Sequence, residues 1–562
     1  MRPGEKIFLV LAAATLVLVL SLVPTNPKSQ AMLADPSPVD WENVRDDPER
    51  KLSVSWQGII GQTGAMEGSW IEQNLEKRFN LDLAPVFMDA NAYQKRRPLM
   101  LIGGDVPDVM WSGDPLAVRA NLRNGFIMEV PYEVILKYCP TYVKMVNKFG
   151  KEAWIYAQYQ GRNYGLPTVS AGADRPRIGC WRMDWLRKVG IDKVPGTVEE
   201  MHEALRRIRY NDPDGNGRQD TYGWCPNISH WSLAFAEVFA AYDVLPFDLM
   251  EREGKVVWGG LLPETKEALR ELRKWYQEGL LDPDFPLDTQ GRNVESVFTN
   301  GKVGYVYPID FPWYYQPDEK DSFYGRLRAF DPGAELAPGP PLHDRNGRRR
   351  GRSWGGGAHI MQFGKHLEQQ PGKVVRVLKM MEAIAVSEEL YLETRNGKRG
   401  LHWDYNPAAY LQPGGKVQKE GINLLPPFDE KTRGLKNSAE LLGGNNIFFF
   451  PSSFEPVYDE QLMSAADREW LHRNRLREWG MANVLGKSDV VPSSGRYLGD
   501  LVNFQMTTFI EMVIGKRDVE EFDDFVLEWR RRGGDVILKQ ANEMSRQIRT
   551  IYDLVGVKKE GE

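Results

Sequence analysis

Residues 51–88 show a strand, a helix and a second strand in direct succession, and this order restricts the fold more than any other feature of the chain. Strand-forming residues cover 51–60 and 81–88, and 64–80 between them carries apolar residues at helical spacing. A β-α-β unit requires parallel strands with helices covering the sheet, which predicts an α/β protein. At 562 residues the chain is long enough for two or three domains.

A sheet of this kind also predicts where a ligand binds. Ligands collect at the carboxyl ends of parallel strands, so the loop after Val109, which carries Trp111 and Asp114, is a natural binding position. The alternative is a plain turn with a half-buried Trp.

The segment from Asn211 to Gly223 has a residue spacing that points to a specific chemistry. Side-chain oxygens recur at every second position, a glycine follows, and a further carboxylate stands at the ninth place, as in a calcium-binding loop. Gly215 and Gly217 permit the left-handed backbone that such a loop needs. A helix that begins after a capping box at Thr197 would lead into the loop and support it. The predicted calcium ligands are the side chains of Asp212, Asp214, Asn216 and Asp220 and the carbonyl oxygen of Arg218.

The match to a calcium loop is partial. The twelfth position of an EF-hand loop is a bidentate Glu, whereas this chain has Gly223, so an oxygen from elsewhere must complete the coordination shell. A turn without an ion is the alternative, because Asp, Asn and Gly are the ordinary residues of turns. We favour a structural calcium ion, since carboxylates this close repel one another unless a cation lies among them.

The first 31 residues resemble a secretory signal. Arg2 and Lys6 precede an apolar stretch over 7–23, and the small-residue site at 29–31 allows cleavage after Ala31. An uncleaved N-terminal anchor is the alternative, because the stretch is only slightly shorter than a spanning helix. No Cys lies near this site, which excludes a bacterial lipid anchor of the usual kind. We expect a periplasmic or extracellular protein whose residues 32–50 form a linker.

Charge and cysteine content exclude further classes. The net charge of -5 gives no reason to expect nucleic acid as a partner. The three cysteines, Cys139, Cys180 and Cys225, allow at most one disulfide, and we predict isolated buried thiols.

Aromatic residues are abundant, with 17 Trp, 22 Tyr and 23 Phe. The apolar face of a pyranose packs on an aromatic ring, so this content favours sugar binding, although most rings must belong to the core. An arginine cluster between 348 and 352 is predicted to be a solvated loop. The residues predicted to contact a sugar adjoin Gly, Pro or polar residues where a strand or helix ends, and a core position is the alternative for each. They are Trp111, Asp114, Trp181, Trp231, Trp313, Trp354 and Trp403.

Catalytic motifs fail on inspection. His202 and Glu203 begin a metalloprotease motif, but Arg206 stands where the second His is required. Residues 351–355 fit the nucleophile-elbow pattern without a clear strand before them. A glycoside hydrolase needs two carboxyl groups about 5–10 Å apart, and among 77 acidic residues such pairs prove nothing. We predict a binding protein without catalysis, with a secreted polysaccharide-active hydrolase as the alternative.

Six segments spread over nearly the whole chain follow the order of one known family. They are 161–167, 181–186 with the helix after Thr197, 212–223, 301–304, 401–405 and 509–517. Together they resemble the extracellular solute-binding proteins of ABC carbohydrate importers, specifically the long branch with a calcium loop that includes alginate- and oligosaccharide-binding lipoproteins.

The resemblance implies a monomer with two α/β lobes, a cleft that closes on an oligosaccharide, and docking of the closed form onto membrane permeases. The expected lobes are 51–165 with 295–365 and 166–294 with 366–562. By the same resemblance, the acidic loop holds calcium. The missing lipobox Cys departs from this branch and leaves open how the protein is held at a membrane. A binding protein that reports to a membrane sensor is a further alternative.

Overall fold

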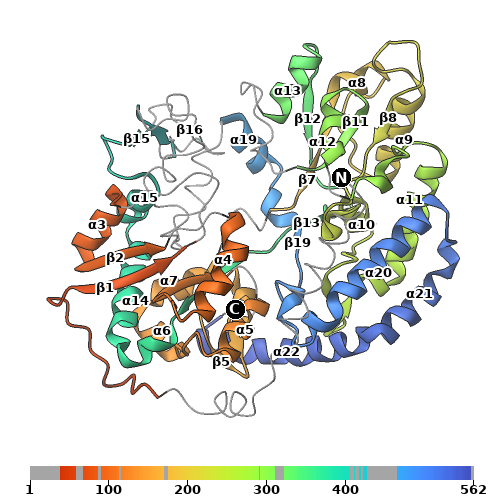
Figure 1. The fold of residues 1–562 in the computed structure, drawn as a ribbon. Helices are drawn as coiled ribbons and strands as arrows, with labels where there is room; N and C mark the ends of the chain where they lie inside the picture. Colours follow the sequence, from red (N-terminus) through yellow and green to blue (C-terminus); the bar gives the residue numbers. More distant parts are fainter. Residues whose placement is uncertain are drawn as a thin grey trace, which may run out of the picture.

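The structure is a computed structural model with two lobes, each built on its own sheet (Figure 1). The predicted α/β class is confirmed. The predicted signal or anchor at 1–31 lies outside the described residues. These are 38–58, 68–86, 90–112, 115–169, 175–289, 292–309, 322–405, 410–411, 417–418, 422–426 and 465–557.

The first lobe contains the predicted β-α-β unit. β1 (Leu52–Gln57) and β2 (Leu81–Val86) pair in parallel, and α3 (Trp70–Phe79) connects them. The Ser69 hydroxyl caps this helix by accepting a hydrogen bond from the backbone N–H of Glu72 (3.2 Å). The sheet has the order β2-β1-β3-β14-β6, and β14 is antiparallel to both of its neighbours. The remaining strands are β3 (Val109–Ser112), β6 (Leu166–Val169) and β14 (Gly357–Phe363).

Helices cover the first sheet and bury an apolar core that includes Val54, Trp56 and Trp154. Short strand pairs extend this lobe at β15 (Trp403–Tyr405) with β18 (Ile422–Leu424) and at β16 (Tyr410–Leu411) with β17 (Val417–Gln418). The helices are α4 (Ala90–Ile102), α5 (Pro115–Arg123), α6 (Tyr132–Tyr138), α7 (Pro140–Phe149), α14 (Pro371–Val386) and α15 (Glu388–Asn396).

The second lobe has a sheet of order β12-β7-β11-β8 and a hairpin of β9 (Leu249–Arg252) and β10 (Lys255–Trp258). The strands are β7 (Ile178–Arg182), β8 (Tyr222–Trp224), β11 (Val303–Ile309) and β12 (Leu336–Gly339). The helices are α8 (Met183–Lys188), α9 (Val198–Tyr210), α10 (Ala236–Ala241), α11 (Pro263–Gln277), α12 (Arg292–Thr299), α13 (Phe323–Phe330), α20 (Ser494–Ile514) and α21 (Phe522–Trp529). α19 (Ala465–Arg473) precedes α20 along the chain.

The last helix, α22 (Asp535–Val555), joins the two cores. Ile537 and Met544 belong to a large apolar cluster that contains the core of the second lobe and also reaches Ile360 of the first sheet. Ile551 and Val555 belong to the other cluster, which lies in the first lobe. Figure 1 shows α22 at the lower edge of the second lobe, running toward the first lobe. A helix anchored in both cores stabilises their connection.

The strands and helices divide between the lobes differently from the expected ranges. β6 lies in the first sheet, whereas β11 and β12 pair in the second sheet with β7. α14 and α15 pack in the core of the first lobe. Local patterns show that a segment is a strand, but they do not show which distant strand it pairs with.

Residues 38–50, expected as a linker, pack on the first lobe instead. Val39 and Val44 are buried, and Arg376 of α14 donates to the Asp46 carboxylate (2.7 Å). Lys379 reaches the second oxygen of the same carboxylate (3.1 Å). The high content of Pro and acidic residues concealed these contacts.

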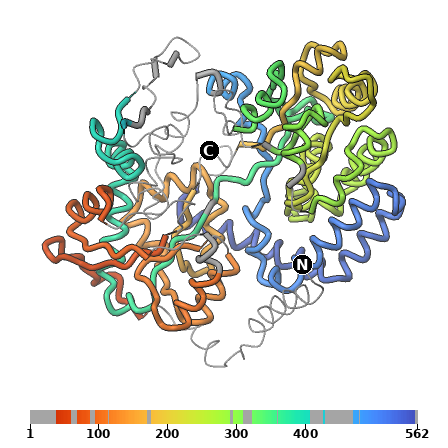
Figure 2. Tube along the Cα trace, turned by 45° about the horizontal axis from the view of Figure 1, so that its top comes forward, coloured from red at the N-terminus to blue at the C-terminus, as the bar shows by residue number. Residues whose placement is uncertain are grey.

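Three segments lie side by side where the chain passes between the sheets. Arg177 donates its backbone N–H to the carbonyl oxygen of Arg352 (2.9 Å), and Ser353 donates to that of Met481 (2.7 Å). β13 (Gly351–Arg352) accordingly runs parallel to β19 (Gly480–Met481). Figure 2 shows the green segment around residue 350 passing from one lobe to the other. Any movement of one lobe against the other must bend these segments.

The cysteine prediction is confirmed, because Cys139, Cys180 and Cys225 are all buried free thiols. Burial raises the pKa of each thiol, which keeps it protonated. Among the helices that the structure describes, none is long and apolar enough to cross a membrane.

Candidate functional site

Trp354 is the centre of the candidate site, and it follows the crossing strand β13. The residue is half-buried. The Arg352 guanidinium lies 3.9 Å from the centroid of the indole ring, and that of Arg177 lies 5.9 Å from it. Both distances suit a cation–π contact. An aromatic ring flanked by two cations is therefore held between the lobes.

A second tryptophan joins this group through a histidine. His230 is exposed and meets the Trp354 ring edge-on, with centroids 5.2 Å apart. It also stacks with Trp231 at 5.7 Å, and Trp231 rests on Phe247 at 5.8 Å. Two residues predicted to contact a sugar, Trp231 and Trp354, thus lie on one continuous aromatic surface.

Arg352 is buried behind this surface, with 4% of the residue exposed. Its Nε lies 3.4 Å from an oxygen of the buried Asp248 carboxylate. Among the described residues, Nε and Nη1 have no hydrogen-bond acceptor. The prediction of a solvated loop is wrong for Arg352, because the guanidinium stacks on Trp354 and pairs with a carboxylate about a hundred residues away in sequence.

Two further polar groups lie deeper in the second lobe. Glu237 on α10 is 4% exposed, and burial raises its pKa to about 8, which leaves it mostly protonated at pH 7. Tyr307 on β11 is 1% exposed, and burial followed by the Glu237 charge raises its pKa. Arg352 and Arg177 oppose this rise, so all four groups are within electrostatic reach. Glu237 Oε2 and the Tyr307 hydroxyl have no hydrogen-bond partner among the described residues.

The imidazole at the surface of the site is uncharged at neutral pH. Partial burial lowers the pKa of His230, and the nearby Arg352 lowers it further. Nδ1 of His230 lies 3.0 Å from the Ser232 hydroxyl. This contact holds the ring in its edge-on position against Trp354.

The other predicted sugar contacts are not part of this surface. Trp111 is 3% exposed on β3, and Trp181 and Trp403 are each 2% exposed. These three are core residues, so they offer no exposed ring to a ligand in this structure. Asp114 and Trp313 lie outside the described residues.

Close packing explains why two of these tryptophans are buried. Trp181 packs on Tyr305 with centroids 4.4 Å apart, and Gly179 leaves the space for the Tyr305 ring. Trp403 donates its indole N–H to the carbonyl of Gly397 (2.8 Å). A neighbouring glycine marks close packing here and not a strand end open to a ligand.

The acidic loop draws three carboxylates around one asparagine. The Asn216 side-chain amide donates to Asp214 (2.8 Å) and Asp220 (3.0 Å), and its backbone N–H donates to Asp212 (3.1 Å). The Arg218 backbone N–H donates to the side-chain oxygen Oδ1 of Asn216 (2.8 Å). All five predicted calcium ligands therefore belong to one hydrogen-bonded turn.

The backbone of this loop has the form that the sequence predicts. Gly215 and Gly217 have φ values of 72° and 73°, and the loop follows α9 directly. The Thr197 hydroxyl caps α9 by accepting from Glu200 N–H (3.2 Å), while the Glu200 side chain bonds the N–H of Gly196 (2.7 Å) in place of that of Thr197. The loop thus starts from a rigid, capped helix.

Charge repulsion within the loop is only partly relieved. Burial, the hydrogen bond with Asp212 and the charge of Asp220 raise the pKa of Asp214, whereas Asn216 and then Lys302 lower that of Asp220. Lys302 reaches an Asp220 oxygen at 3.0 Å. Within the part of the chain that the structure describes, no three His, Cys, Asp or Glu side chains form a closed metal site. The oxygen-only donor set is nevertheless of the type that calcium prefers.

Comparison with known proteins gives the family. A model of the bacterial extracellular solute-binding proteins matches residues 64–382, more than half of the chain. The chain belongs to this family. Among curated relatives of this solute-binding protein, the polygalacturonan/rhamnogalacturonan-binding protein YtcQ of Bacillus subtilis is 24% identical over 364 residues, which cover 64% of this chain and 68% of YtcQ.

Two solved structures share its fold. The alginate-binding protein AlgQ2, solved without calcium ion, has a TM-score of 0.58 at 18% identity and covers 89% of this chain and 98% of its own. An EF-hand mutant of FusA, an ABC-transporter substrate-binding protein of S. pneumoniae solved with fructo-nystose, has a TM-score of 0.60 at 16% identity, with 89% and 99% covered. The expected two-lobed binding-protein fold is confirmed.

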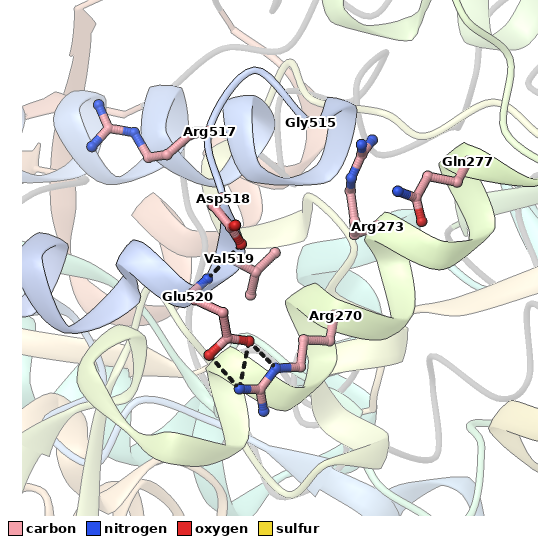
Figure 3. A pocket seen from close by; sticks show the side chains of 8 residues that line it. All are labelled: Arg270, Arg273, Gln277, Gly515, Arg517, Asp518, Val519 and Glu520. Carbon is pink, nitrogen blue, oxygen red and sulfur yellow. Dashed lines mark hydrogen bonds and ion pairs between the residues drawn. The ribbon is translucent and has the colours of Figure 1, made fainter.

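A separate hollow of about 360 Å³ lies in the second lobe of the solute-binding protein, between α11 and the loop after α20 (Figure 3). Its Arg270 pairs with Glu520 (2.7 Å), and its Arg273 lies against Gly515 and approaches the carbonyl of Val513 (3.4 Å). A cation at the last turn of a helix is stabilised by the helix dipole. These arginines hold the end of α20 and the loop that follows it against α11. Their contacts explain the position of both arginines without a ligand.

Four residues of the candidate site were missed from sequence: Arg177, His230, Glu237 and Tyr307. His230 adjoins the predicted Trp231, and Arg177 lies four positions before the predicted Trp181, so both lie close to residues that had been singled out. Glu237 carried no local signal, whereas Tyr307 stands in the aromatic-rich stretch 303–315. The significance of both residues comes from burial without a partner among the described residues.

Proposed function

We propose that this solute-binding protein is the substrate-binding component of an ABC importer and that it binds an oligosaccharide on the Trp231–Trp354 surface. The family and the polysaccharides that YtcQ and AlgQ2 bind support an oligosaccharide as the ligand class. FusA, a substrate-binding protein of an ABC transporter, supports ABC permeases as the partners. The solute-binding protein acts as an exported monomer. We propose a secretory signal or an uncleaved anchor at residues 1–31 on the sequence pattern alone.

The observation that carries the proposal is the position of the aromatic surface. Trp354 lies on a segment that crosses between the lobes, and Trp231 lies in the second lobe. Half-buried indole rings suit the apolar faces of sugar rings, and the adjoining arginines and imidazole supply polar contacts. A ligand on this surface therefore touches the connection between the lobes itself.

The mechanism we propose is hinge closure without catalysis. A sugar that contacts both lobes binds the closed state more tightly than the open state and shifts the population toward it. The three crossing segments bend during this change. Closure then presents a surface that the permeases recognise, and the sugar leaves unchanged.

We propose further that the acidic loop holds a structural calcium ion. The side chains of Asp212, Asp214, Asn216 and Asp220 and the Arg218 carbonyl supply the oxygens. Burial raises the pKa of Asp214, the nearby carboxylates add to this rise, and an ion would relieve their repulsion. The calcium-free form of AlgQ2 and the EF-hand mutant of FusA support such a site in this fold. The ion ties the loop to α9 and takes no part in sugar binding.

Sugar binding is tested by calorimetric titration of a panel of oligosaccharides into the wild type, Trp354→Ala and Trp70→Ala. Trp70 is the matched control, because it is also half-buried and meets a histidine edge-on (His402, 5.7 Å), but in α3. We expect Trp354→Ala to weaken binding by about tenfold or more, ~1.4 kcal/mol, and Trp70→Ala to leave it unchanged. Equal affinities for all three proteins would refute the proposed surface, and release of shorter sugars during the titration would show a hydrolase.

Calcium binding is tested by thermal unfolding with calcium and with chelator. An ion at a hundred times its Kd stabilises the folded state by about 2.7 kcal/mol, so chelation should lower the Tm of the wild type by several degrees. Asp214→Asn should remove this difference, whereas Asp192→Asn, on the surface before α9, should keep it. If the chelator does not change the Tm of the wild type, the loop is an ordinary turn without an ion.

A further inference from the structure

The polar groups that surround Trp354 are mostly hydrogen-bond donors. Arg177 and Arg352 carry donors only, and they lie 5.9 Å and 3.9 Å from the ring centroid. Behind them, the Tyr307 hydroxyl and the mostly protonated Glu237 also present O–H groups. A surface of this kind favours a ligand that brings acceptors.

Acceptors on the protein side are buried or engaged. The carboxyl groups that act on His230 and Tyr307 from within the described residues are Asp248 and Glu237. Asp248 is buried against Arg352 Nε (3.4 Å) and the Asn483 amide (3.4 Å). Glu237 is buried and mostly uncharged at pH 7. The hydroxyl donors of a neutral sugar therefore meet no exposed carboxylate among these groups.

We propose that the oligosaccharide is acidic and that one of its uronate residues stacks on Trp354 with its carboxylate directed to Arg177. This inference rests on the proposed function. A planar carboxylate matches the fork of a guanidinium, and such charge-assisted pairs are stronger than neutral hydrogen bonds. The buried Arg352 supplies positive charge from behind the ring, and the half-buried Arg177 reaches the ligand from the crossing segment.

The experiment compares two ligands that differ only in charge. Oligogalacturonate trimers and the same trimers as methyl esters share length, linkage and ring shape. Calorimetric Kd values at low and high salt should favour the acid form at low salt by about tenfold to a hundredfold, the range of one or two charge-assisted hydrogen bonds. Salt should reduce this preference, because it screens the ion pair.

Arg177→Gln locates the preference on the protein. We expect this variant to raise the Kd of the acid trimer by about tenfold and to change the Kd of the methyl ester by no more than about twofold. Arg270→Gln is the control, because it removes the same charge from the hollow beside α20 and should change neither Kd.

Four outcomes would overturn the inference. Tighter binding of the ester, or an equal loss for both ligands in Arg177→Gln, rejects an acidic ligand but leaves an oligosaccharide-binding protein. Absence of binding by both trimers and by every sugar of the neutral panel rejects the proposed function and this inference together. If Arg177→Gln still prefers the acid form as strongly as the wild type does, the carboxylate binds at another position and the inference about Arg177 is wrong.

Discussion

Glu237 should make the stability of the protein fall as pH rises through the neutral range. The side chain is 4% exposed, and its Oε2 has no hydrogen-bond partner among the described residues. Burial raises its pKa from the ordinary 4.5 to about 8. Because the folded state binds this proton more tightly than the unfolded chain, stability is fully present below pH 4.5 and is lost as pH rises toward 8.

The size of this effect follows from the shift. One pKa unit corresponds to 1.36 kcal/mol, so the rise at Glu237 corresponds to roughly 4–5 kcal/mol of unfolding free energy between pH 4.5 and 8. Glu237→Gln keeps a neutral side chain of the same shape at every pH. The variant should match the wild type near pH 5 and be more stable than it at pH 8.5.

Urea unfolding of both proteins at pH 5, 7 and 8.5 measures the effect, with tryptophan fluorescence as the signal. Glu203→Gln is the control, because hydrogen bonds from Arg206 and Arg207 lower the pKa of Glu203, and this carboxylate lies on the surface of α9. Its removal should not steepen or reverse the pH dependence between 5 and 8.5. If Glu237→Gln follows the wild-type curve throughout, Glu237 is ionised in the folded protein and the reasoning from burial is wrong.

Two further predictions concern the connection between the lobes. Burial and the charge of Lys487 lower the pKa of His359 on β14 to about 4, so the protein loses stability as pH falls from 6.5 toward 4. His359→Gln should reduce this loss of unfolding free energy by about 3 kcal/mol. Urea titrations in which the variant loses as much stability at acid pH as the wild type would contradict this prediction. Gly356 lies so close to the first lobe that an added Cβ would come within 1.3 Å of the Phe149 carbonyl oxygen. Gly356→Ala should therefore cost about 3 kcal/mol or more, while Gly499→Ala in α20, where the added Cβ meets nothing within 4 Å, should be neutral or stabilising in the same thermal melts.

Local signals predicted local structure well. The β-α-β unit at 51–88 and the helix capped by Thr197 depend on residues a few positions apart, and both occur in the structure. Sheet membership depends on pairing over long distances: β14 inserts between β3 and β6, which precede it by about two hundred residues. No periodicity within a segment encodes that choice, which is why the expected lobe ranges misplace β11, β12, α14 and α15.

The candidate site was predictable only where exposure and sequence context agree. Trp354 stands in a short loop between β13 and β14, Trp231 begins a 3-10 helix before α10, and both remain half-buried. Trp181 and Trp403 stand in similar sequence contexts but are buried. Composition misled most at Arg352. A run of arginines normally marks a solvated loop, yet Asp248 and Trp354 provide a buried position for one of them.

In the proposed mechanism, recognition of the ligand and movement of the lobes share the same residues. Arg352 contacts Trp354 through its side chain and accepts a hydrogen bond from Arg177 at its backbone carbonyl. The next residue, Ser353, donates its backbone N–H to Met481 in the third crossing segment. A ligand held by Trp354 and Arg177 therefore acts directly on the hydrogen-bonded strands that must bend when the lobes close. Because the free energy of binding is applied at the hinge, a change at Trp354 or Arg177 should alter both the affinity and the degree of closure, whereas a contact far out on either lobe would alter affinity alone.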